Sequence, residues 1–339
     1  MADRVRTCPY CGAPLHPSRF ARIATCEYCN SAVHLDEQVI SASRFREAHR
    51  EWVDSGRDGD RSWLAVGRDH WAPIRLLAHG EFSDVFLADR GRRPTERALL
   101  KLLRNGDDLP VLEREWTALQ ELQASTAPGA DALAARLPQP IDRGEVRSGD
   151  RAGAHALVLR WAPGFEHTFE AIRTAFPRGV SARVSIWMWR RLLETLAFVH
   201  RSGFVHGAVL PQHLLVERGE HGLRLVGYGC AGHVGEALTA VVTRYEGFYP
   251  AAMLAEQRLS PEHDLAMSAR CVAYALGADD GTNLPASVPA TLRDLVRAVG
   301  RGEDSGEAWD LRQRVGVVGR ELFGAASFHP LTMPGDRAR

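Results

Sequence analysis

The residues nearest the start of the chain that could do chemistry are four cysteines, arranged as two Cys-x-x-Cys pairs. Fourteen residues separate the first pair, Cys8 and Cys11, from the second pair, Cys26 and Cys29. Each pair is followed directly by glycine or asparagine, which tolerate the positive φ of a tight turn. Four thiolates are the ligand set of a tetrahedral structural zinc site. Residues 1–36 are therefore predicted to form a zinc ribbon that a bound Zn²⁺ stabilises.

Other uses of these cysteines stay open. A redox pair or a disulfide-linked finger would use the same residues, and His16 or His34 could replace a thiolate as a ligand. A site closed by four cysteines has no open coordination position for a substrate. This module is therefore expected to dock onto protein or nucleic acid, and not to catalyse.

A single lysine is the next candidate. The chain has 42 lysine and arginine residues, and Lys101 is the only lysine among them. Lysine carries a compact charge on a flexible stem, which the planar guanidinium of arginine does not reproduce. Its presence in "ALLKLLR", in a chain that otherwise uses arginine, is an exception that needs an explanation.

Three stretches share order and separation with motifs of protein kinases. "AHGEFSDV" (78–85) resembles the glycine-rich loop that covers the phosphates, and "ALLKLLR" resembles the strand with the phosphate-contacting lysine. "VHGAVLPQHLLV" (205–216) resembles the catalytic loop, in the H-G-D form of bacterial relatives. The resemblance covers about residues 70–324. It implies that Lys101 pairs with Glu115 on the following helix, with Glu113 as a neighbouring candidate.

The same resemblance assigns further residues to a nucleotide. Ala78, Gly80 and Val85 fall at loop positions that cover the phosphates, and Leu159–Ala162 fall at the hinge between lobes. Asp264 matches the structural aspartate of the large lobe. ATP or ADP is the cofactor that these positions imply.

The residues that carry phosphoryl transfer in the family are missing. Ala208 replaces the catalytic base, Leu210 replaces a lysine, His213 replaces the metal-binding asparagine, and Gly227 replaces the metal-binding aspartate. In kinases the protein mainly positions the groups and holds Mg²⁺. Glycine offers no ligand, and histidine suits this hard cation poorly. The resemblance with these losses predicts a pseudokinase, so any nucleotide would be held without Mg²⁺.

The predicted elements suit a two-lobed α+β fold. Apolar alternation and short apolar runs predict strands, and spacings of three and four predict helices. One helix stands among the early strands, whereas the later chain is mainly helical. The strands are expected over 74–90, 97–104 and 155–164, and the helices over 109–123 and 181–203.

These elements also set the expected boundaries. The small lobe is placed at about 70–160 and the large lobe at about 161–324. Residues 37–69 are expected to form a helical and flexible linker, with a helix that includes Phe45 and Trp52. The remaining residues, 325–339, are expected to form a disordered tail.

Composition limits the partners. The chain has 42 basic and 42 acidic residues, and zero net charge argues against a general nucleic-acid binder. No apolar run approaches the roughly 20 residues of a membrane span. The start "MADRVRTCPYC" lacks the apolar core of a secretory signal. The protein is therefore expected to be cytoplasmic, to bind protein partners and to make no contact with a membrane. A bacterial origin is also expected.

The expected function is a catalytically inactive kinase-like scaffold or regulatory binding protein, with the zinc ribbon as a docking module. One alternative is an unconventional nucleotide-using transferase on the same fold, because fold does not fix chemistry. In that alternative His213 would act as a base or a soft-metal ligand within a group of histidines near the cleft. The second alternative is a nucleic-acid adaptor in which the zinc ribbon is primary. The histidines of that group are His200, His206, His213, His221 and His233.

Overall fold

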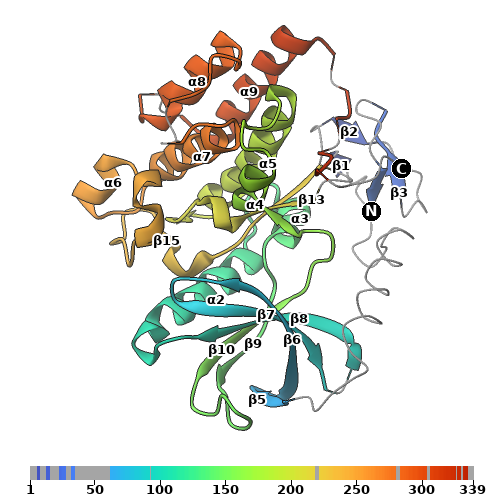
Figure 1. The fold of residues 1–339 in the computed structure, drawn as a ribbon, viewed down its shortest axis with the longest axis vertical. Helices are drawn as coiled ribbons and strands as arrows, with labels where there is room; N and C mark the ends of the chain where they lie inside the picture. The colour runs from blue at the N-terminus through green and yellow to red at the C-terminus, as the bar shows by residue number, and fades with distance from the viewer. Residues whose placement is uncertain are drawn as a thin grey trace.

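The computed structural model describes most of the chain from residue 62 onward and four short pieces before it. From residue 62 the chain forms two lobes, one built on a sheet with a long helix and one built mainly of helices (Figure 1). The prediction of a two-lobed α+β fold is confirmed. The described residues are 6–7, 13–15, 23–27, 32–34, 62–91, 93–217, 221–279, 283–303, 306–325, 327–329 and 331–334.

The small lobe is a six-stranded antiparallel sheet with the order β5-β6-β7-β8-β10-β9. The strands alternate or carry short apolar runs, which suits a sheet with apolar cores on its faces. The register places Val85 of β7 opposite Lys101 of β8. The strands are β5 (Leu64–Val66), β6 (Asp69–His79), β7 (Ser83–Arg90), β8 (Arg93–Leu103), β9 (Pro140–Glu145) and β10 (His155–Arg160).

The first strand, β5, brings the two edges of this sheet together. The Arg147 N–H, just after β9, donates to the Ala65 carbonyl at 2.9 Å, and the Arg68 N–H donates to Asp142 Oδ2 at 2.8 Å. Leu64 and its neighbours thereby enclose a second apolar cluster with Trp71 on the outer side of the sheet. Covering both edges removes sites for unwanted strand pairing. The small lobe therefore starts earlier than the boundary near residue 70 that the sequence suggests.

Helix α2 (Leu109–Ala124) packs against the other face of the sheet. Its apolar side buries Leu112, Leu119 and Leu122, which follow the helical spacing, and it buries Glu115 among them. Asp108 is the N-cap residue but forms no capping hydrogen bond through its side chain. The side chain of Asn105 caps the preceding turn, η1 (Gly106–Asp108), so the helix is entered through a 3₁₀ turn.

The large lobe is assembled around helix α5 (Ala182–Arg201). The Ser181 hydroxyl caps its N-terminus by accepting the Val184 N–H, and Gly203, with φ +82°, follows its last turn. Serine at the N-cap and glycine just past the last turn are residue types favoured at these positions, and the ends agree with the helix expected over 181–203. The helix is buried on almost all sides and contacts α7 and α9. The other helices are α3 (Ala130–Leu133), α4 (Phe169–Ala175), α6 (Ala251–Glu256), α7 (Pro261–Ala275), α8 (Ala290–Gly300) and α9 (Ala308–Phe323).

A short hairpin lies beside α5 and carries part of the cleft between the lobes. β13 (Leu214–Glu217) pairs antiparallel with β14 (Gly222–Leu225), and β13 also pairs with β11 (His167–Thr168). The turn η3 (Pro211–His213) leads into β13. After β14 the chain enters the turn η4 (Tyr228–Cys230), which contacts α2. The hairpin thus joins two stretches whose motifs the sequence analysis singled out.

The remaining short elements complete the large lobe. β12 (Phe204–Val205) pairs with β15 (Gly232–His233) beside the catalytic-loop segment. Two further 3₁₀ turns are present, η2 (Ala134–Arg136) and η5 (Thr243–Phe248). Among the residues that the structure describes, no helix is long and apolar enough to cross a bilayer.

The segment after α9 packs on the large lobe. Leu331 is 4% exposed and joins the main apolar core. The Phe328 ring stacks on His221, which in turn stacks on Trp187, with centroid separations of 4.1 and 4.3 Å. This part of the expected disordered tail is therefore ordered, because its apolar side chains find a surface that the sequence does not reveal. Residues 335–339 lie outside the described residues.

Two small hairpins precede the lobes. β1 (Arg6–Thr7) pairs with β2 (Pro14–Leu15), and β3 (Ile23–Thr25) pairs with β4 (Ala32–His34). Each Cys-x-x-Cys pair occurs in the sequence that links the two strands of one hairpin. Cys26 is buried, whereas Cys8, Cys11 and Cys29 lie outside the described residues. The expected helix near Phe45 lies outside them too, so the zinc ribbon and the linker remain predictions.

Candidate functional site: the cleft between the lobes

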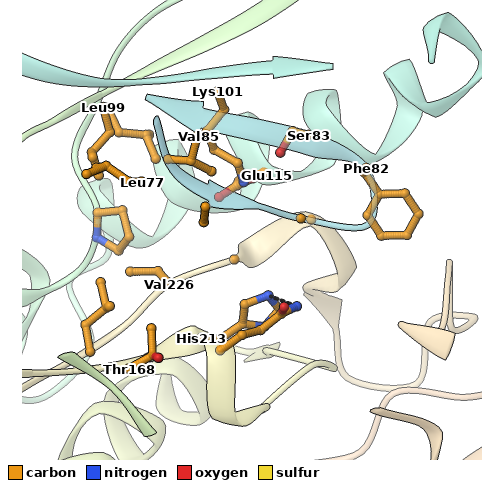
Figure 2. A pocket seen from close by; sticks show the side chains of 18 of the residues that line it. Leu77, Phe82, Ser83, Val85, Leu99, Lys101, Glu115, Thr168, His213 and Val226 are labelled. Atoms are coloured by element: carbon orange, nitrogen blue, oxygen red, sulfur yellow. Dashed lines mark hydrogen bonds and ion pairs between the residues drawn. The ribbon is translucent and has the colours of Figure 1, made fainter. Parts of the chain in front are cut away.

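A cavity of about 530 Å³ lies between the lobes (Figure 2). Strands β6, β7 and β8 supply one wall, and the hairpin β13–β14 with η3 supplies the opposite one. Helix α2 closes one end, and the hinge, residues 159–162, borders the other. Besides the hinge, the residues that the resemblance assigns to a nucleotide line this cavity: Ala78, Gly80, Val85, Lys101 and Glu115.

The lone lysine forms an ion pair at the α2 end of the cavity. Lys101 Nζ donates to Glu115 Oε2, and the two side chains are 17% and 3% exposed. β8 and α2 meet here because both bury an apolar face between them. The pair fixes α2 against the sheet. Glu113, the neighbouring candidate, is on the outer side of the helix and pairs with Arg143.

The loop between β6 and β7 covers the cavity with a tight turn. The Gly80 N–H donates to the Ser83 carbonyl at 2.9 Å, and a Cβ on Gly80 would lie 2.9 Å from that oxygen. A side chain at this position would therefore push the turn open. This close approach makes glycine the residue that fits position 80, while position 78 has room for the methyl group of Ala78.

A buried aspartate holds the catalytic-loop backbone in place. Asp264 accepts the N–H groups of His206 and Gly207 at 2.8 and 2.9 Å, and His200 Nε2 lies 3.0 Å away. Burial opposes ionisation of Asp264, but the hydrogen bond from His200 and the nearby imidazoles outweigh it, so its pKa lies below the usual range. The loop keeps its shape through this carboxylate. Gly207, with φ +71°, takes the left-handed turn that the loop requires.

The first histidine of the loop is structural. His206 is fully buried, and burial lowers its pKa to about 3, so the imidazole is neutral near neutral pH. The Ala208 N–H donates to Nδ1 at 3.2 Å, so Nε2 carries the proton and donates to the Val226 carbonyl, also at 3.2 Å. Both ring nitrogens are therefore occupied. Tyr228 packs edge-on against the same ring.

His213 and Gly227 meet in the floor of the cavity. His213 Nδ1 donates to the Ala208 carbonyl at 2.8 Å, and Nε2 accepts from Gln212 Nε2 at 3.2 Å. A Cβ on Gly227 would lie 2.7 Å from His213 Nε2, and Gly227 has φ +82°. The imidazole thus lies against the glycine where a side chain at 227 would begin. Burial, with a smaller contribution from nearby Lys101, lowers the pKa of His213 to about 4, although the hydrogen bond to the Ala208 carbonyl acts to raise it.

The other two replaced positions do not reach the cavity. Ala208 and Leu210 are fully buried in the main apolar core, so neither could contact a bound ligand. Among the described residues, no group of three His, Cys, Asp or Glu side chains is placed to hold a metal ion. The carboxylate of Glu115 is already paired with Lys101. The floor therefore presents a neutral imidazole where protein kinases hold their metal.

The expected group of histidines around the cleft is dispersed. Of its five members only His213 lines the cavity. His200 contacts Asp264, His221 lies in the stack with Trp187, and His233 lies 3.4 Å from Glu121 on the surface. The transferase alternative loses its main argument, because the ring nitrogens do not converge.

Most of the apolar residues that line the cavity were not predicted from the sequence. Leu77 and Leu99 lie on one wall and Leu215 and Val226 on the other, with the hinge at the side. The hinge residues were expected from the resemblance, whereas Leu215 and Val226 were not assigned to the site, although Leu215 lies within the stretch that resembles the catalytic loop. Leu215 follows His213 by two positions, so the alternation of β13 was the available signal.

Comparisons with known proteins support a kinase-like fold. No protein-family model matches the chain. A curated sequence, maternal embryonic leucine zipper kinase of Danio rerio, is 27% identical over 166 residues, which cover 48% of this chain and 22% of that protein. The chain thus spans about a fifth of that relative's length.

A solved structure shows the same arrangement of lobes. The kinase domain of a Toxoplasma gondii specific rhoptry antigen matches with a TM-score of 0.55 at 11% identity, over 82% of this chain and 92% of that one. At this identity the likeness shows the fold alone. The chain therefore has a two-lobed protein-kinase-like fold.

Proposed function

We propose that this protein is a kinase-like scaffold or regulatory binding protein that does not transfer phosphate. The observation that carries the proposal is the contact between His213 and Gly227 in the floor of the cleft. In protein kinases, the two corresponding positions hold Mg²⁺. Here they carry the neutral imidazole of His213 and Gly227, which pack against each other. An aspartate restored at 227 alone would clash with the imidazole of His213, so the histidine at 213 requires the glycine at 227.

The expected loss of chemistry is large. Kinases contribute positioning and charge neutralisation to phosphoryl transfer, and the metal supplies much of the neutralisation. Loss of an acid or base group alone costs on the order of 100- to 10,000-fold. The base position, Ala208, is buried and contributes no carboxylate. Little of a kinase turnover of roughly 1–100 per second would remain.

The cleft is proposed to bind a ligand that regulates the protein. Lys101, Glu115, Ala78, Gly80 and Val85 line the cavity as they would in a nucleotide site. ATP or ADP, held without Mg²⁺, is the candidate from the resemblance. The ordered Lys101–Glu115 pair supports a formed cleft with α2 in place.

The N-terminal module is proposed to be the second docking site. Its four cysteines, Cys8, Cys11, Cys26 and Cys29, would hold a structural Zn²⁺, and the paired hairpins support a zinc ribbon. Such a ribbon would bind a protein partner in the cytoplasm. Zero net charge argues against nucleic acid as that partner.

A phosphotransfer assay tests the proposal. Purified protein is incubated with radiolabelled ATP and a general acceptor protein, with Mg²⁺ and separately with Mn²⁺, alongside Lys101→Ala. We expect no transfer above the Lys101→Ala background. Transfer by the wild-type protein that the variant loses would overturn the proposal. A parallel His213→Ala variant tests the transferase alternative, which requires activity in the wild type and its loss in this variant.

A further inference from the structure

Three arginines line the cavity toward its hinge end. Arg160 ends β10 within the hinge, Arg224 belongs to β14, and Arg75 is the first residue of β6 to line the cavity. Arg75 and Arg160 are exposed, and neither side chain forms an ion pair or a hydrogen bond with another residue that the structure describes. The Arg224 guanidinium lies over the Phe165 ring, 5.1 Å from its centroid. Accessible guanidinium groups suit carboxylates, which they can bind through two parallel hydrogen bonds.

The acidic side chains of the cavity do not balance these arginines. Glu115 is paired with Lys101 at the α2 end. Glu81, in the loop between β6 and β7, adds to the rise that burial causes in the pKa of Tyr249, so it lies near the segment before α6. Among the described residues that line the cavity, this leaves Glu166 as the carboxylate beside three arginines. The hinge end therefore carries an excess of positive charge, which attracts an anionic partner.

The same end of the cavity also presents apolar side chains and backbone groups. Leu76 and Leu77 are 39% and 36% exposed, and both line the cavity, where Leu77 lies in one wall (Figure 2). Within the described part of the chain, no backbone hydrogen bond uses the N–H or C=O groups of Trp161 and Ala162 in the hinge. An extended peptide can pair with such backbone groups while its side chains contact the neighbouring surface.

We propose that this end of the cavity binds an extended segment of a protein partner that carries acidic side chains next to an apolar one. The inference rests on the proposed scaffold function and names the chemistry of one partner. The carboxylates of the segment pair with the arginines, and its apolar side chain covers the two leucines and removes them from water. The proposed surface, called the hinge surface below, comprises Arg75, Leu76, Leu77, Arg160, Phe165 and Arg224.

A nucleic-acid strand is the competing anionic partner. Its affinity rests on many phosphate contacts, whereas the hinge surface has three arginines. A phosphate backbone also brings no aliphatic side chain to the exposed leucines. A polypeptide with both acidic and apolar side chains therefore fits the surface better.

Peptide selection on the full chain tests the inference. A library of short random peptides displayed on phage is selected on the wild-type protein and, in parallel, on Arg75→Gln/Arg160→Gln. We expect the wild-type pool to become rich in aspartate and glutamate next to leucine, isoleucine or phenylalanine. The pool from the double variant should not become rich in acidic residues, because the variant lacks the two accessible guanidinium groups.

Binding of one selected peptide then locates the site. The peptide is synthesised with a fluorophore, and its dissociation constant is measured by anisotropy. We expect the double variant to bind it at least tenfold more weakly, and added salt to weaken wild-type binding. Arg320→Gln removes the same charge from an exposed position of α9 and should bind like the wild type. Circular dichroism confirms that each variant is folded.

A second peptide separates the charge from the apolar contact. It has glutamine in place of each acidic residue and should bind at least tenfold more weakly than the selected peptide. A labelled single-stranded oligonucleotide is measured in the same way. Oligonucleotide binding that the double variant loses, without any peptide binding, would assign the hinge surface to nucleic acid and overturn the inference.

Three further results would overturn it: no enriched peptide, an enriched pool without acidic residues, or peptide binding that the double variant retains. None of these measures phosphotransfer, which the separate assay tests. A failed selection without phosphotransfer leaves the proposed function in place. Phosphotransfer above the Lys101→Ala background would remove the proposed function whatever the peptides show.

Discussion

Two replaced residues in the cleft act as one unit. His213 donates through Nδ1 to the catalytic-loop backbone, and its ring covers the Cα of Gly227. Gly227 supplies both the space for the imidazole and the positive φ of the turn into η4. The imidazole of His213 fits because residue 227 has no side chain, and residue 227 is glycine where a side chain would overlap the imidazole. Read singly from the sequence, they were two lost ligands; in the structure they are a packed contact.

This contact predicts a specific coupling. Gly227→Ala should lower the free energy of unfolding by about 2–4 kcal/mol, because the new Cβ overlaps the imidazole and positive φ strains a non-glycine residue. In a His213→Ala background the overlap disappears and only the φ cost of about 1–2 kcal/mol stays. Urea unfolding of the four proteins gives the interaction energy. Strictly additive effects would contradict the contact.

The ion pair supports a second prediction at this scale. Lys101→Met should destabilise the protein by about 2–3 kcal/mol, because Glu115 would be a buried charge without its partner, while the 17% exposure of the lysine moderates the loss. Adding Glu115→Gln should restore part of the stability. Denaturant midpoints measure both steps.

The comparison variant is Arg75→Met, which removes a cation from the exposed part of β6 and should change stability by less than about 0.5 kcal/mol. An equally small effect of Lys101→Met would mean that the lysine serves only a ligand.

The pairing of Lys101 with Glu115 was predicted from the resemblance to protein kinases. The presence of a single lysine in an arginine-rich chain indicates that its position is special, but it does not identify the residue that pairs with it.

At the scale of elements, the tail and the cleft hairpin are joined. His221, at the turn between β13 and β14, is stacked between Trp187 of α5 and Phe328 of the tail. His221 Nε2 also donates to the His329 carbonyl at 2.6 Å. Through His221, the hairpin that carries cleft residues at its other end is tied to α5 and to the segment after α9. The segment after α9 is a structural part of the large lobe.

Removing the Phe328 ring tests this clamp. Phe328→Ala should cost about 1–2 kcal/mol of unfolding free energy, because a stacked aromatic contact and its buried area are lost together. Thermal or urea unfolding provides the measurement. Val317→Ala, on the exposed face of α9, is the control and should stay within about 0.5 kcal/mol. Equal stability of Phe328→Ala and wild type would show that the stack contributes nothing.

Elements with local signals were predicted and those with distant partners were not. α5 has a serine cap, a glycine stop and helical spacing within one stretch, so its ends follow from the sequence. β5 has three residues and becomes a strand only because β6 and the end of β9 lie beside it. The stack of Trp187, His221 and Phe328 likewise joins separate segments. Local rules carry no information on such contacts.

The whole molecule combines two sites with different chemistry. Among the described residues, the cleft brings no three His, Cys, Asp or Glu side chains together, whereas the N-terminal sequence has four cysteines in zinc spacing. Metal analysis of the purified full chain should give about one zinc per chain. Cys8→Ser should reduce the zinc content, whereas Cys271→Ser, at a buried cysteine of α7, should not. Zinc-free protein, purified without chelator, would contradict the zinc ribbon.

The stability of the whole chain should fall as the pH drops below about 6.5. The pKa of His206 is lowered to about 3 and that of His213 to about 4, both mainly by burial. Between these values and about 6.5 the unfolded chain binds protons that the folded chain does not. Each fully shifted histidine therefore removes about 1.4 kcal/mol per pH unit in this window. His213 keeps some exposure, so its share is smaller.

Urea unfolding at about pH 7 and about pH 5 measures this loss, which we expect to be about 2–3 kcal/mol. The lowered carboxyl pKa values of Asp264 and Glu194 act in the same direction but only below about pH 4.5, where unfolded carboxyls start to protonate. His213→Gln should reduce the loss, because one of the two buried imidazoles is gone. His233→Gln, at the exposed surface, should leave it unchanged. A stability that is flat across this range would mean that water or a rearranged loop solvates the protonated rings, and the closed floor of the cleft would then open in mild acid.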